Sequence, residues 1–536
     1  SMRIIHTADW HVGVRLESYE RTFEHKKFFE FLYNFLQMQE QEGRPIDAIL
    51  VSGDLYNSCV PSQELQKMLN TFWHDLICDF PQLSIYVIAG NHDNGQLLDN
   101  VDIVCMSERM HCLGSVPLKE KISTKINASN DLLASNNLQE RAQAASASLT
   151  IPNNAQALSS KADVTPIIPK KMLQVDLDQM IYPLKERDGS LKGYLAMVPF
   201  IREGGLGRGV LFSDDSVHTA SECVAELCRQ LAHRIEELKV SNPSLKDNSL
   251  GQTLVSPEAR KDQKLVSISM AHLAVSGKNS LADAAYDENV IAAGGVAGVN
   301  GESIDYFDYT ALGHIHLKYS TGTAGGGNRL HYSGSPLPIN FSESEYRHAF
   351  KVLEIGPKGE ITYEDVLVPR AVDLIKIPSG PQSKVGCTPH EALDLIKKLP
   401  NEPLALEARP LVSVYLRSDA LGTRGSRSRS DIASEIRQAM PENCRLCSVR
   451  TVEAPRTKQQ QEEEEVLQDL SSMQPIDVFS MYARKKLGTS EVPADLLKLF
   501  NSIVKKVKNE LDNGSDSNLE AASATNTLTH TDSTNI

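Results

Sequence analysis

Five apolar, strand-like runs in this chain each end in side chains that can bind a metal ion. A buried carboxylate or imidazole is costly unless it has a partner. In an α/β sheet, the carboxyl ends of neighbouring strands meet at one edge. Any fold of this chain must therefore accommodate a cluster of Asp, Asn and His. The five endings are Asp9-Trp-His11, Gly53-Asp54, Gly90-Asn91-His92-Asp93, Ala271-His272 and Gly313-His314-Ile-His316.

Strand-like and helix-like segments alternate around these endings. We predict buried strands in RIIHTAD, AILVSGD, IYVIAGN, GYLAMVPFI, KLVSISMAHLAV and DYTALGHIHLK. Amphipathic helices are predicted in KKFFEFLYNFLQMQEQ and SQELQKMLNTFWHDLI and near 219–239, and a Gly-rich hairpin in GTAGGGNRLHYSGSP. This alternation is typical of an α/β fold with its site at the carboxyl ends of the strands.

The sequence pattern predicts four parts along the chain. Residues 2–370 would form one large domain, interrupted at 116–172 by a low-complexity insertion rich in Ser, Ala, Asn and Gln. A β-α-β-α-β pattern predicts a small α/β domain at 371–455. Two amphipathic helical stretches follow at 456–511, and a polar tail at 512–536 is predicted to be disordered.

Composition narrows the possible functions. The 536 residues carry a net charge of −14, which argues against a protein that coats nucleic acid with its whole surface. An enzyme whose nucleic-acid substrate reaches a local metal site or a basic partner stays compatible with this charge. The 9 scattered cysteines predict reduced thiols and a cytoplasmic location. No apolar run is long enough to span a bilayer, so we expect no membrane association.

Seven of the side chains at the strand ends are candidate metal ligands. They are too many for one tetrahedral zinc ion, and they suit two ions that share a bridging carboxylate, for which Asp54 is the candidate. Nitrogen and oxygen donors without thiolate favour Mn, Fe or Zn over Ca. Two such ions, about 3.5–4 Å apart, would activate water for attack at phosphorus. The candidate ligands are Asp9, His11, Asp54, Asn91, His272, His314 and His316.

Local geometry predicts three further features of the site. In Asp9-x-His11 and in His314-x-His316, an extended chain would point both side chains the same way. Trp10 would then point to the opposite face and pack in the core. The glycines beside Asp54, Asn91 and His314 would leave room for a ligand. His92 is not needed to complete either metal shell, so we expect it to contact the phosphate and assist the leaving oxygen.

The motifs D-x-H, GD, GNHD, H and GHxH, in this order, resemble those of the calcineurin-like metallophosphoesterases. RIIHTADWHVG, DAILVSGDLY, IAGNHD, YTALGHIH and YSGSPLPINFSE resemble the branch of this family that comprises DNA nucleases of double-strand-break repair. The resemblance covers roughly 2–115 and 190–370, and more loosely 371–511. It implies a β-sandwich flanked by helices, with a small α/β capping domain and C-terminal helices that dock on a partner.

The resemblance also implies roles for the site residues. One Mn ion would be held by Asp9, His11, Asp54 and His316, and the other by Asp54, Asn91, His272 and His314, with His92 acting on the phosphodiester. Some relatives place a second functional His three residues after the bridging Asp. This chain has Asn57 there, so that role has no candidate.

For activity and partners, the resemblance implies a 3′→5′ exonuclease on duplex ends and an endonuclease on single strands and hairpins. It implies a homodimer, with 62–78 and 96–108 as candidate contacts, and a partnership with a long coiled-coil ATPase. The ATP requirement would belong to that partner, because this chain has no GxxxxGK[ST] loop.

Two sets of residues are weaker candidates. The first set consists of basic residues that could contact DNA or could equally be solvated surface charges. The second set consists of apolar residues that could dock on a partner or pack within the chain. The DNA-contact candidates are Lys278, Arg424 and Arg427. The docking candidates are Phe479, Met481, Tyr482 and Leu487.

Two other functions fit part of the sequence. A protein phosphatase or cyclic-nucleotide phosphodiesterase on the same fold would share the metal motifs, but has no evident need of the GSPLP segment, the small domain or the final helices. A non-catalytic module on a decayed phosphoesterase fold would be expected to have lost ligands, whereas all seven and His92 are present.

Overall fold

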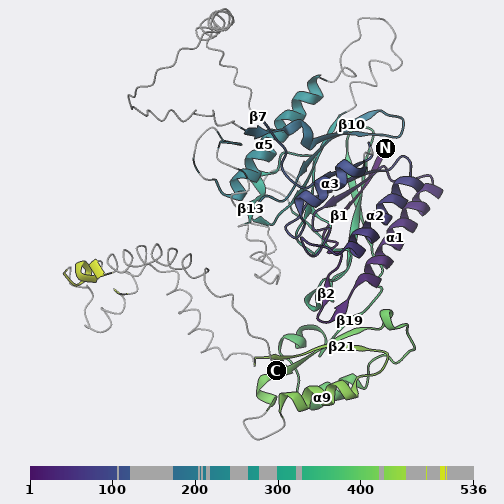
Figure 1. Cartoon of the computed structure of the whole chain (residues 1–536), viewed down its shortest axis with the longest axis vertical. Helices are drawn as coiled ribbons and strands as arrows, with labels where there is room; N and C mark the ends of the chain where they lie inside the picture. Colours follow the sequence, from purple (N-terminus) through teal and green to yellow (C-terminus); the bar gives the residue numbers. More distant parts are fainter. Residues whose placement is uncertain are drawn as a thin grey trace, which may run out of the picture. The chain divides into compact units, whose positions relative to one another are not determined.

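The structure is a computed structural model of the chain (Figure 1). It describes residues 1–105, 108–120, 173–202, 206, 209–212, 216, 218–241, 264–276, 298–321, 329–421, 428–453, 479, 495–500 and 502–503. The chain divides into two compact units, the first comprising 1–416 and 420–451 and the second 417–419 and 452–536. Within the described ranges, no helix has the length and apolar character needed to cross a bilayer.

The first unit contains a six-stranded sheet with the order β18-β17-β1-β4-β5-β6. Strands β1, β4, β5 and β6 are parallel, whereas β17 is antiparallel to β1 and β18 is antiparallel to β17. The three strands predicted in the first 115 residues are confirmed as β1, β4 and β5. The bounds are β1 Met2–Thr7, β4 Ala48–Ser52, β5 Ser84–Ile88, β6 Met110–Leu113, β17 Ala349–Ile355 and β18 Ile361–Leu367.

A second six-stranded sheet has the order β15-β16-β14-β11-β10-β9. Its inner strands β10, β11, β14 and β16 are parallel, and both edge strands are antiparallel to their neighbours. The antiparallel pair β15–β16 confirms the predicted hairpin. The bounds are β9 Ile181–Lys185, β10 Leu191–Val198, β11 Val266–His272, β14 Tyr309–Gly313, β15 Tyr319–Thr321 and β16 Leu330–Tyr332.

One hydrophobic core lies between the two sheets and another lies under two helices. Ile4 and Leu50 of the first sheet share a core with Ile268 of the second. The other face of the first sheet is covered by α1 Thr22–Gln41 and α2 Gln63–Asp79, which bury Leu32 and Leu69 against it (Figure 1). Helix α5 Ala220–Ser241 packs its apolar side into the first core and contacts β10. The result is the predicted β-sandwich flanked by helices.

Trp10 lies in the core under the helices and has no exposed surface. Its ring stacks on Trp73 of α2 at 5.2 Å and meets Phe28 of α1 edge-on at 5.3 Å. Its indole N–H donates to the hydroxyl of Thr7 at 2.9 Å. The prediction that Trp10 packs in the core is therefore confirmed.

The predicted small α/β pattern is present as a three-stranded sheet, β19-β20-β21, with its own core. Capping boxes begin both of its helices, at Thr388 with Glu391 and at Ser428 with Asp431. The boundaries predicted at 371 and 455 stay predictions. The bounds are β19 Leu374–Ile377, α8 Pro389–Ile396, β20 Leu411–Arg417, α9 Arg429–Ala439 and β21 Arg445–Val452.

The remaining described elements are short, apart from helix α3 Gly95–Cys105. Strand pairs are β2 Arg15–Leu16 with β3 Tyr19–Glu20, β7 Leu118–Glu120 with β8 Leu173–Val175, and β12 Val275–Ser276 with β13 Val299–Asn300. The 3₁₀ turns are η1 Leu177–Met180, η4 Gly301–Ser303, η5 Phe341–Glu343, η6 Gly380–Lys384, η7 Leu406–Ala408 and η8 Ser418–Leu421. Most of the predicted insertion, residues 121–172, and the predicted tail, 512–536, lie outside the described residues.

Candidate metal centre

The carboxyl ends of β1, β4 and β5 in one sheet meet those of β11 and β14 in the other. Across this junction, the ring Nδ1 of His272 donates to the carbonyl of Ser52 at 2.8 Å, and the hydroxyl of Ser52 donates to the carbonyl of Ala311 at 2.9 Å. The junction brings together the side chains that the sequence predicted. Three groups have ligand atoms within 4.8 Å of one another: Asp9, His11 and His316; His11, Asp54 and His92; and Asp9, Asp54 and His272.

The backbone at these strand ends is not extended. Positive φ angles occur at Asp9 (55°), His11 (46°), Asp54 (51°) and His314 (95°). The prediction that an extended chain aligns Asp9 with His11 and His314 with His316 is therefore wrong, because β1 already ends at Thr7 and β14 at Gly313. Sharp turns bring the side chains together instead. Each such backbone conformation costs about 1–3 kcal/mol in a non-glycine residue and is typical of functional sites.

Glycines allow the turns to approach one another. A Cβ atom on Gly53, whose φ is +88°, would overlap Nδ1 of His272. A Cβ atom on Gly90 would overlap the carboxylate of Asp54. At both positions the missing side chain lets a neighbouring turn approach closely, whereas room for a ligand beside these glycines stays a prediction.

Asp54 lies at the centre of the cluster with 2% of its surface exposed. One oxygen, Oδ1, accepts the backbone N–H of His92 at 2.9 Å. The other, Oδ2, lies 3.5 Å from Nε2 of His11 and 3.4 Å from Nε2 of His272. Burial opposes its charge, but the neighbouring imidazoles hold the pKa of Asp54 well below its usual range. Asp54 is thus an ionised carboxylate. Its Oδ2 lies between two halves of the cluster, one containing His11 and the other containing His272.

Asp9 and His11 each carry a polar atom that has no hydrogen-bond partner among the described residues. Oδ1 of Asp9 accepts the backbone N–H of His314 at 2.9 Å. Within the described parts of the chain, its Oδ2 and Nδ1 of His11 are buried without a hydrogen-bond partner. Burial raises the pKa of Asp9 to about 6, although His272 and His316 act against this rise. Orphaned buried polar atoms are rare and costly, and a cation held by the cluster would give this carboxylate oxygen a partner.

Asn91 joins the cluster through its side-chain oxygen. Nε2 of His272 lies 3.0 Å from this oxygen, and Nδ1 of His314 lies 3.1 Å from it. The bond to the carbonyl of Ser52 places a proton on Nδ1 of His272, which directs Nε2 into the site. Burial lowers the pKa of His314 to about 3. Burial also acts to lower the pKa of His272, but Asp54 and Asp9 raise it to about 9.

His316 connects the cluster to a residue for which the sequence suggested no role. Its Nε2 lies 3.1 Å from Nε2 of His11, and its Nδ1 lies 2.8 Å from Oε1 of Glu343. Burial acts to lower the pKa of His316, but Glu343, Asp9 and Asp54 raise it to about 9. The only signal in the sequence was the carboxylate that ends YSGSPLPINFSE.

Asp93 is a second carboxylate without a predicted role. It is buried and accepts the backbone N–H groups of Leu55 at 3.0 Å, Tyr56 at 2.9 Å and Gly90 at 2.8 Å. Asp93 therefore ties the turn after β4, which carries Asp54, to the turn after β5. Its place as the last letter of GNHD was the available signal.

His92 lies at the exposed side of the cluster, with its ring 4.9 Å from that of His11. Nδ1 of His92 lies 3.1 Å from the backbone carbonyl of Asn57. A carbonyl only accepts, so Nδ1 carries the proton and Nε2 is left for other proton chemistry. Residue 57 therefore contributes through its backbone. Nearby, the exposed Arg202 donates to the carbonyl of Asn91 at 3.0 Å.

The weaker candidates mostly lie outside the described residues. Phe479, in the second unit, is described, and its ring stacks on Phe500 at 4.1 Å. The candidates outside the description are Lys278, Arg424, Arg427, Met481, Tyr482 and Leu487.

The donor set fits a divalent metal. It combines carboxylates, an amide oxygen and imidazoles without thiolate, as Mn, Fe or Zn sites do. The opposed Nε2 atoms of His11 and His316, 3.1 Å apart, converge on the same point, as ligands of a cation do. Asp9 offers a carboxylate oxygen within 4.8 Å of the ligand atoms of both histidines.

The comparisons with known proteins agree with this geometry. The family model described as calcineurin-like phosphoesterase matches residues 2–150. Residues 2–150 are thus similar to the calcineurin-like phosphoesterases. Members of this domain family bind divalent metals, which accords with the Asp and His cluster.

The chain is also similar to SbcD proteins, which are named as components of the nuclease SbcCD. The SbcD protein from Rhodobacter capsulatus is 26% identical, over 78% of this chain and 81% of its own length. That from Bacillus subtilis is 25% identical, over 70% of this chain and 72% of its own length. That from Escherichia coli K12 is 25% identical, over 65% of this chain and 64% of its own length. The resemblance that the motifs indicated is confirmed.

Proposed function

We propose that this protein is a Mn-dependent DNA nuclease that hydrolyses phosphodiester bonds at a two-metal centre. One observation carries the proposal. The Oδ2 atom of Asp54 lies between His11 and His272, inside a cluster where Oδ2 of Asp9 lacks a partner among the described residues. Similarity to the SbcD proteins supports DNA as the substrate.

The two halves of the cluster suggest which residues hold each ion. Asp54 would belong to both sets, because its Oδ2 faces both halves. When bound, the ions would lower the pKa of a water molecule and stabilise the charge that develops on the phosphate. The first set is Asp9, His11, Asp54 and His316, and the second is Asp54, Asn91, His272 and His314.

Residues of the chain itself would handle the proton and the substrate. The bond from Nδ1 of His92 to the carbonyl of Asn57 fixes the ring, so that Nε2 can hold the proton that the leaving oxygen receives. Arg202, anchored to the carbonyl of Asn91, would place a cation where a phosphodiester approaches. His92 would thus be the general acid and Arg202 a binding residue.

The wider function follows the SbcD resemblance. The protein would act as a 3′→5′ exonuclease on duplex ends and as an endonuclease on single strands and hairpins. It would form a homodimer, contacting its copy through 62–78 and 96–108, and work with an SbcC-type coiled-coil ATPase. The small domain at 371–455 would guide DNA, and the helices at 456–511 would dock on the ATPase. The 8 free cysteines among the described residues accord with the cytoplasm.

The test is cleavage of an end-labelled DNA hairpin by the full chain, with Mn²⁺ or with EDTA. We expect cleavage with Mn²⁺ alone, and none by the His92→Gln variant. Hydrolysis of bis(p-nitrophenyl) phosphate without DNA cleavage, also after addition of the coiled-coil ATPase, would point to another phosphodiesterase. Hydrolysis of p-nitrophenyl phosphate alone would indicate a phosphatase. Metal binding without any hydrolysis would contradict an enzymatic role.

A further inference from the structure

We propose that Glu343 is a positioning residue for the metal centre, which holds His316 so that its Nε2 faces the cation. The inference rests on the proposed function, because it assigns His316 as a metal ligand. It adds a residue that lies 27 positions further along the chain and outside the ligand motifs.

The contact between Glu343 and His316 is short and buried. Oε1 of Glu343 lies 2.8 Å from Nδ1 of His316, and Glu343 is 5% exposed. The second oxygen, Oε2, accepts the backbone N–H of Ile339 at 2.8 Å. The side chain of Asn340 donates to Oε1 at 3.2 Å. Both carboxylate oxygens are therefore fixed, and the carboxylate cannot rotate away from His316 without losing these bonds.

The turn that carries Glu343 is itself held in place. Glu343 ends the 3₁₀ turn η5, which the side chain of Asn340 caps by accepting the N–H of Ser342 at 2.8 Å. Nε2 of His348 lies 3.4 Å from the carbonyl of Glu343. Arg370 donates to the carbonyl of Ser344 at 2.6 Å. The position of the carboxylate is thus set by the protein before a metal binds.

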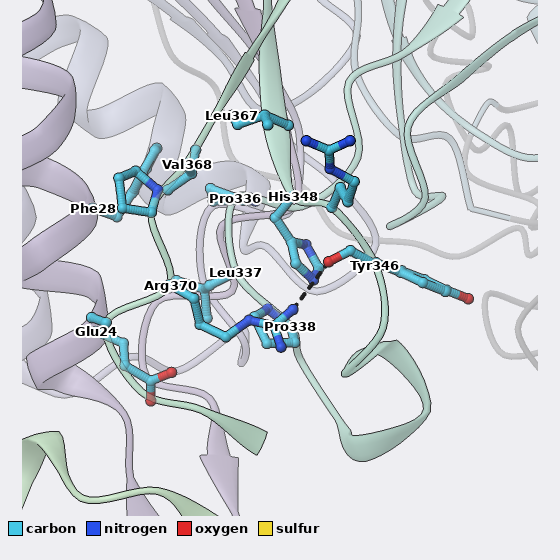
Figure 2. A pocket seen from close by; sticks show the side chains of 13 residues that line it. Glu24, Phe28, Pro336, Leu337, Pro338, Tyr346, His348, Leu367, Val368 and Arg370 are labelled. Carbon is cyan, nitrogen blue, oxygen red and sulfur yellow. Dashed lines mark hydrogen bonds between the residues drawn. The ribbon is translucent and has the colours of Figure 1, made fainter. Parts of the chain in front are cut away.

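The packing of Phe341 on one side of η5 and a hydrogen bond of Arg370 on the other help to hold this turn in place. Phe341, at the start of the turn, shares a core with Leu374 and Leu411 of the small sheet. A cavity of about 210 Å³ lies beside the same segment and is lined by residues 336–338 and 346–348. Figure 2 shows Arg370 in this cavity, bonded to the carbonyl of Tyr346 at 3.0 Å. Both contacts fix the chain that presents Glu343.

The chemistry of imidazole ligands explains why a carboxylate is placed here. A histidine that binds a metal through Nε2 must carry its proton on Nδ1, and an acceptor at Nδ1 fixes both this tautomer and the ring rotation. Without the acceptor, the proton can move to Nε2, which then cannot bind the metal. Loss of such a partner commonly weakens metal binding about 10–100-fold. Glu343 would therefore act through His316, without touching metal or substrate.

A purely structural role for Glu343 predicts a different result. If the carboxylate served only to hold η5, its loss would lower the stability of the metal-free protein and disturb both ion sites together. A positioning role predicts that only the ion held with His316 is affected.

The test measures Mn²⁺ binding to the full-length Glu343→Gln variant by calorimetry and electron paramagnetic resonance. We expect the affinity of one of two ions to fall about 10–100-fold, with the other affinity and the metal-free melting temperature unchanged. The matched control is Glu345→Gln, on the same segment, which should bind both ions as the wild type does. If Glu343→Gln does not fold, Glu343→Asp, which keeps the charge at shorter reach, should give an intermediate affinity.

Three results would overturn the inference. Wild-type affinity for both ions in Glu343→Gln, or in Glu343→Asp where only that variant folds, would overturn the positioning role and leave the proposed function intact. Equal loss of both ions together with a lower metal-free melting temperature would show a structural role. A wild-type protein that binds no Mn²⁺ would refute the proposed function as well, so the two failures can be told apart.

Discussion

Replacement of Asp9 by Asn should stabilise the metal-free protein. Asp9 is fully buried, its Oδ2 lacks a partner among the described residues, and burial raises its pKa from 3.8 to about 6. A raised carboxylate pKa means that ionisation of the carboxylate destabilises the fold. This destabilisation is absent below pH 3.8 and is complete above pH 6. A rise of this size corresponds to about 3 kcal/mol at pH 7. An amide keeps the acceptor for the N–H of His314 and removes the charge.

The chain offers a local probe for this measurement. Its 2 tryptophans, Trp10 and Trp73, stack in the core under α1 and α2, so their fluorescence follows the unfolding of the first sheet and these helices. In urea with EDTA, Asp9→Asn should raise the free energy of unfolding by up to about 3 kcal/mol. With Mn²⁺ the wild type should become the more stable protein. Each ion at 100 times its Kd adds about 2.7 kcal/mol to the free energy of unfolding, and Asp9→Asn gains less because it lacks a metal ligand.

Asp93 provides the matched contrast. Burial, together with Asp54, also raises the pKa of Asp93 to about 6, but its carboxylate accepts three backbone N–H groups. Asp93→Asn should therefore lower the free energy of unfolding by about 1–3 kcal/mol, because an amide N–H₂ would face these donors. A metal-free Asp9→Asn protein that is less stable than the wild type, or that gains as much from Mn²⁺, would refute the reasoning for Asp9.

Three further predictions concern the site. His92→Gln should lose DNA cleavage while keeping wild-type Mn²⁺ affinity by calorimetry, and loss of metal together with cleavage would contradict a role in proton transfer. Since the pKa values of His272 and His316 are about 9, Mn²⁺ must displace protons from them. Affinity should rise between pH 6 and pH 9, with proton release visible in buffers of different ionisation enthalpy, whereas a flat profile would argue against these ligands. Asn57→Ala should cleave DNA much as the wild type does, because the backbone carbonyl of residue 57 makes the bond to His92 and is kept in the variant. A large loss would show that the side chain acts.

The sequence was sufficient for the fold and for most of the cluster. Apolar runs that end in Asp, Asn or His marked β1, β4, β5, β11 and β14, and the alternation with helices fixed how these strands are connected. Because parallel strands present their carboxyl ends at one edge, the candidate ligands within each sheet could be predicted as a group, whereas the meeting of the two groups depends on how the sheets pack. Trp10 could be placed in the core because it lies between two polar residues that face the site.

Other features depend on tertiary structure and could not be read from local pattern. The backbone is left-handed at four positions because the chain turns sharply there. The alternation of side chains along an extended strand does not predict such turns. The positions are Asp9, His11, Asp54 and His314. Glu343 reaches His316 only because η5 folds back onto the end of β14. For such contacts, the partner is decided by the packing of distant segments, and a single sequence does not record it.

The most direct test of the two-metal centre is an anomalous difference map from crystals of the protein grown with Mn²⁺, collected at the manganese edge. We predict two peaks about 3.5–4 Å apart, with the carboxylate of Asp54 between them and His316 bound to one of them. A single peak, or peaks away from Asp54, would contradict the two-metal centre.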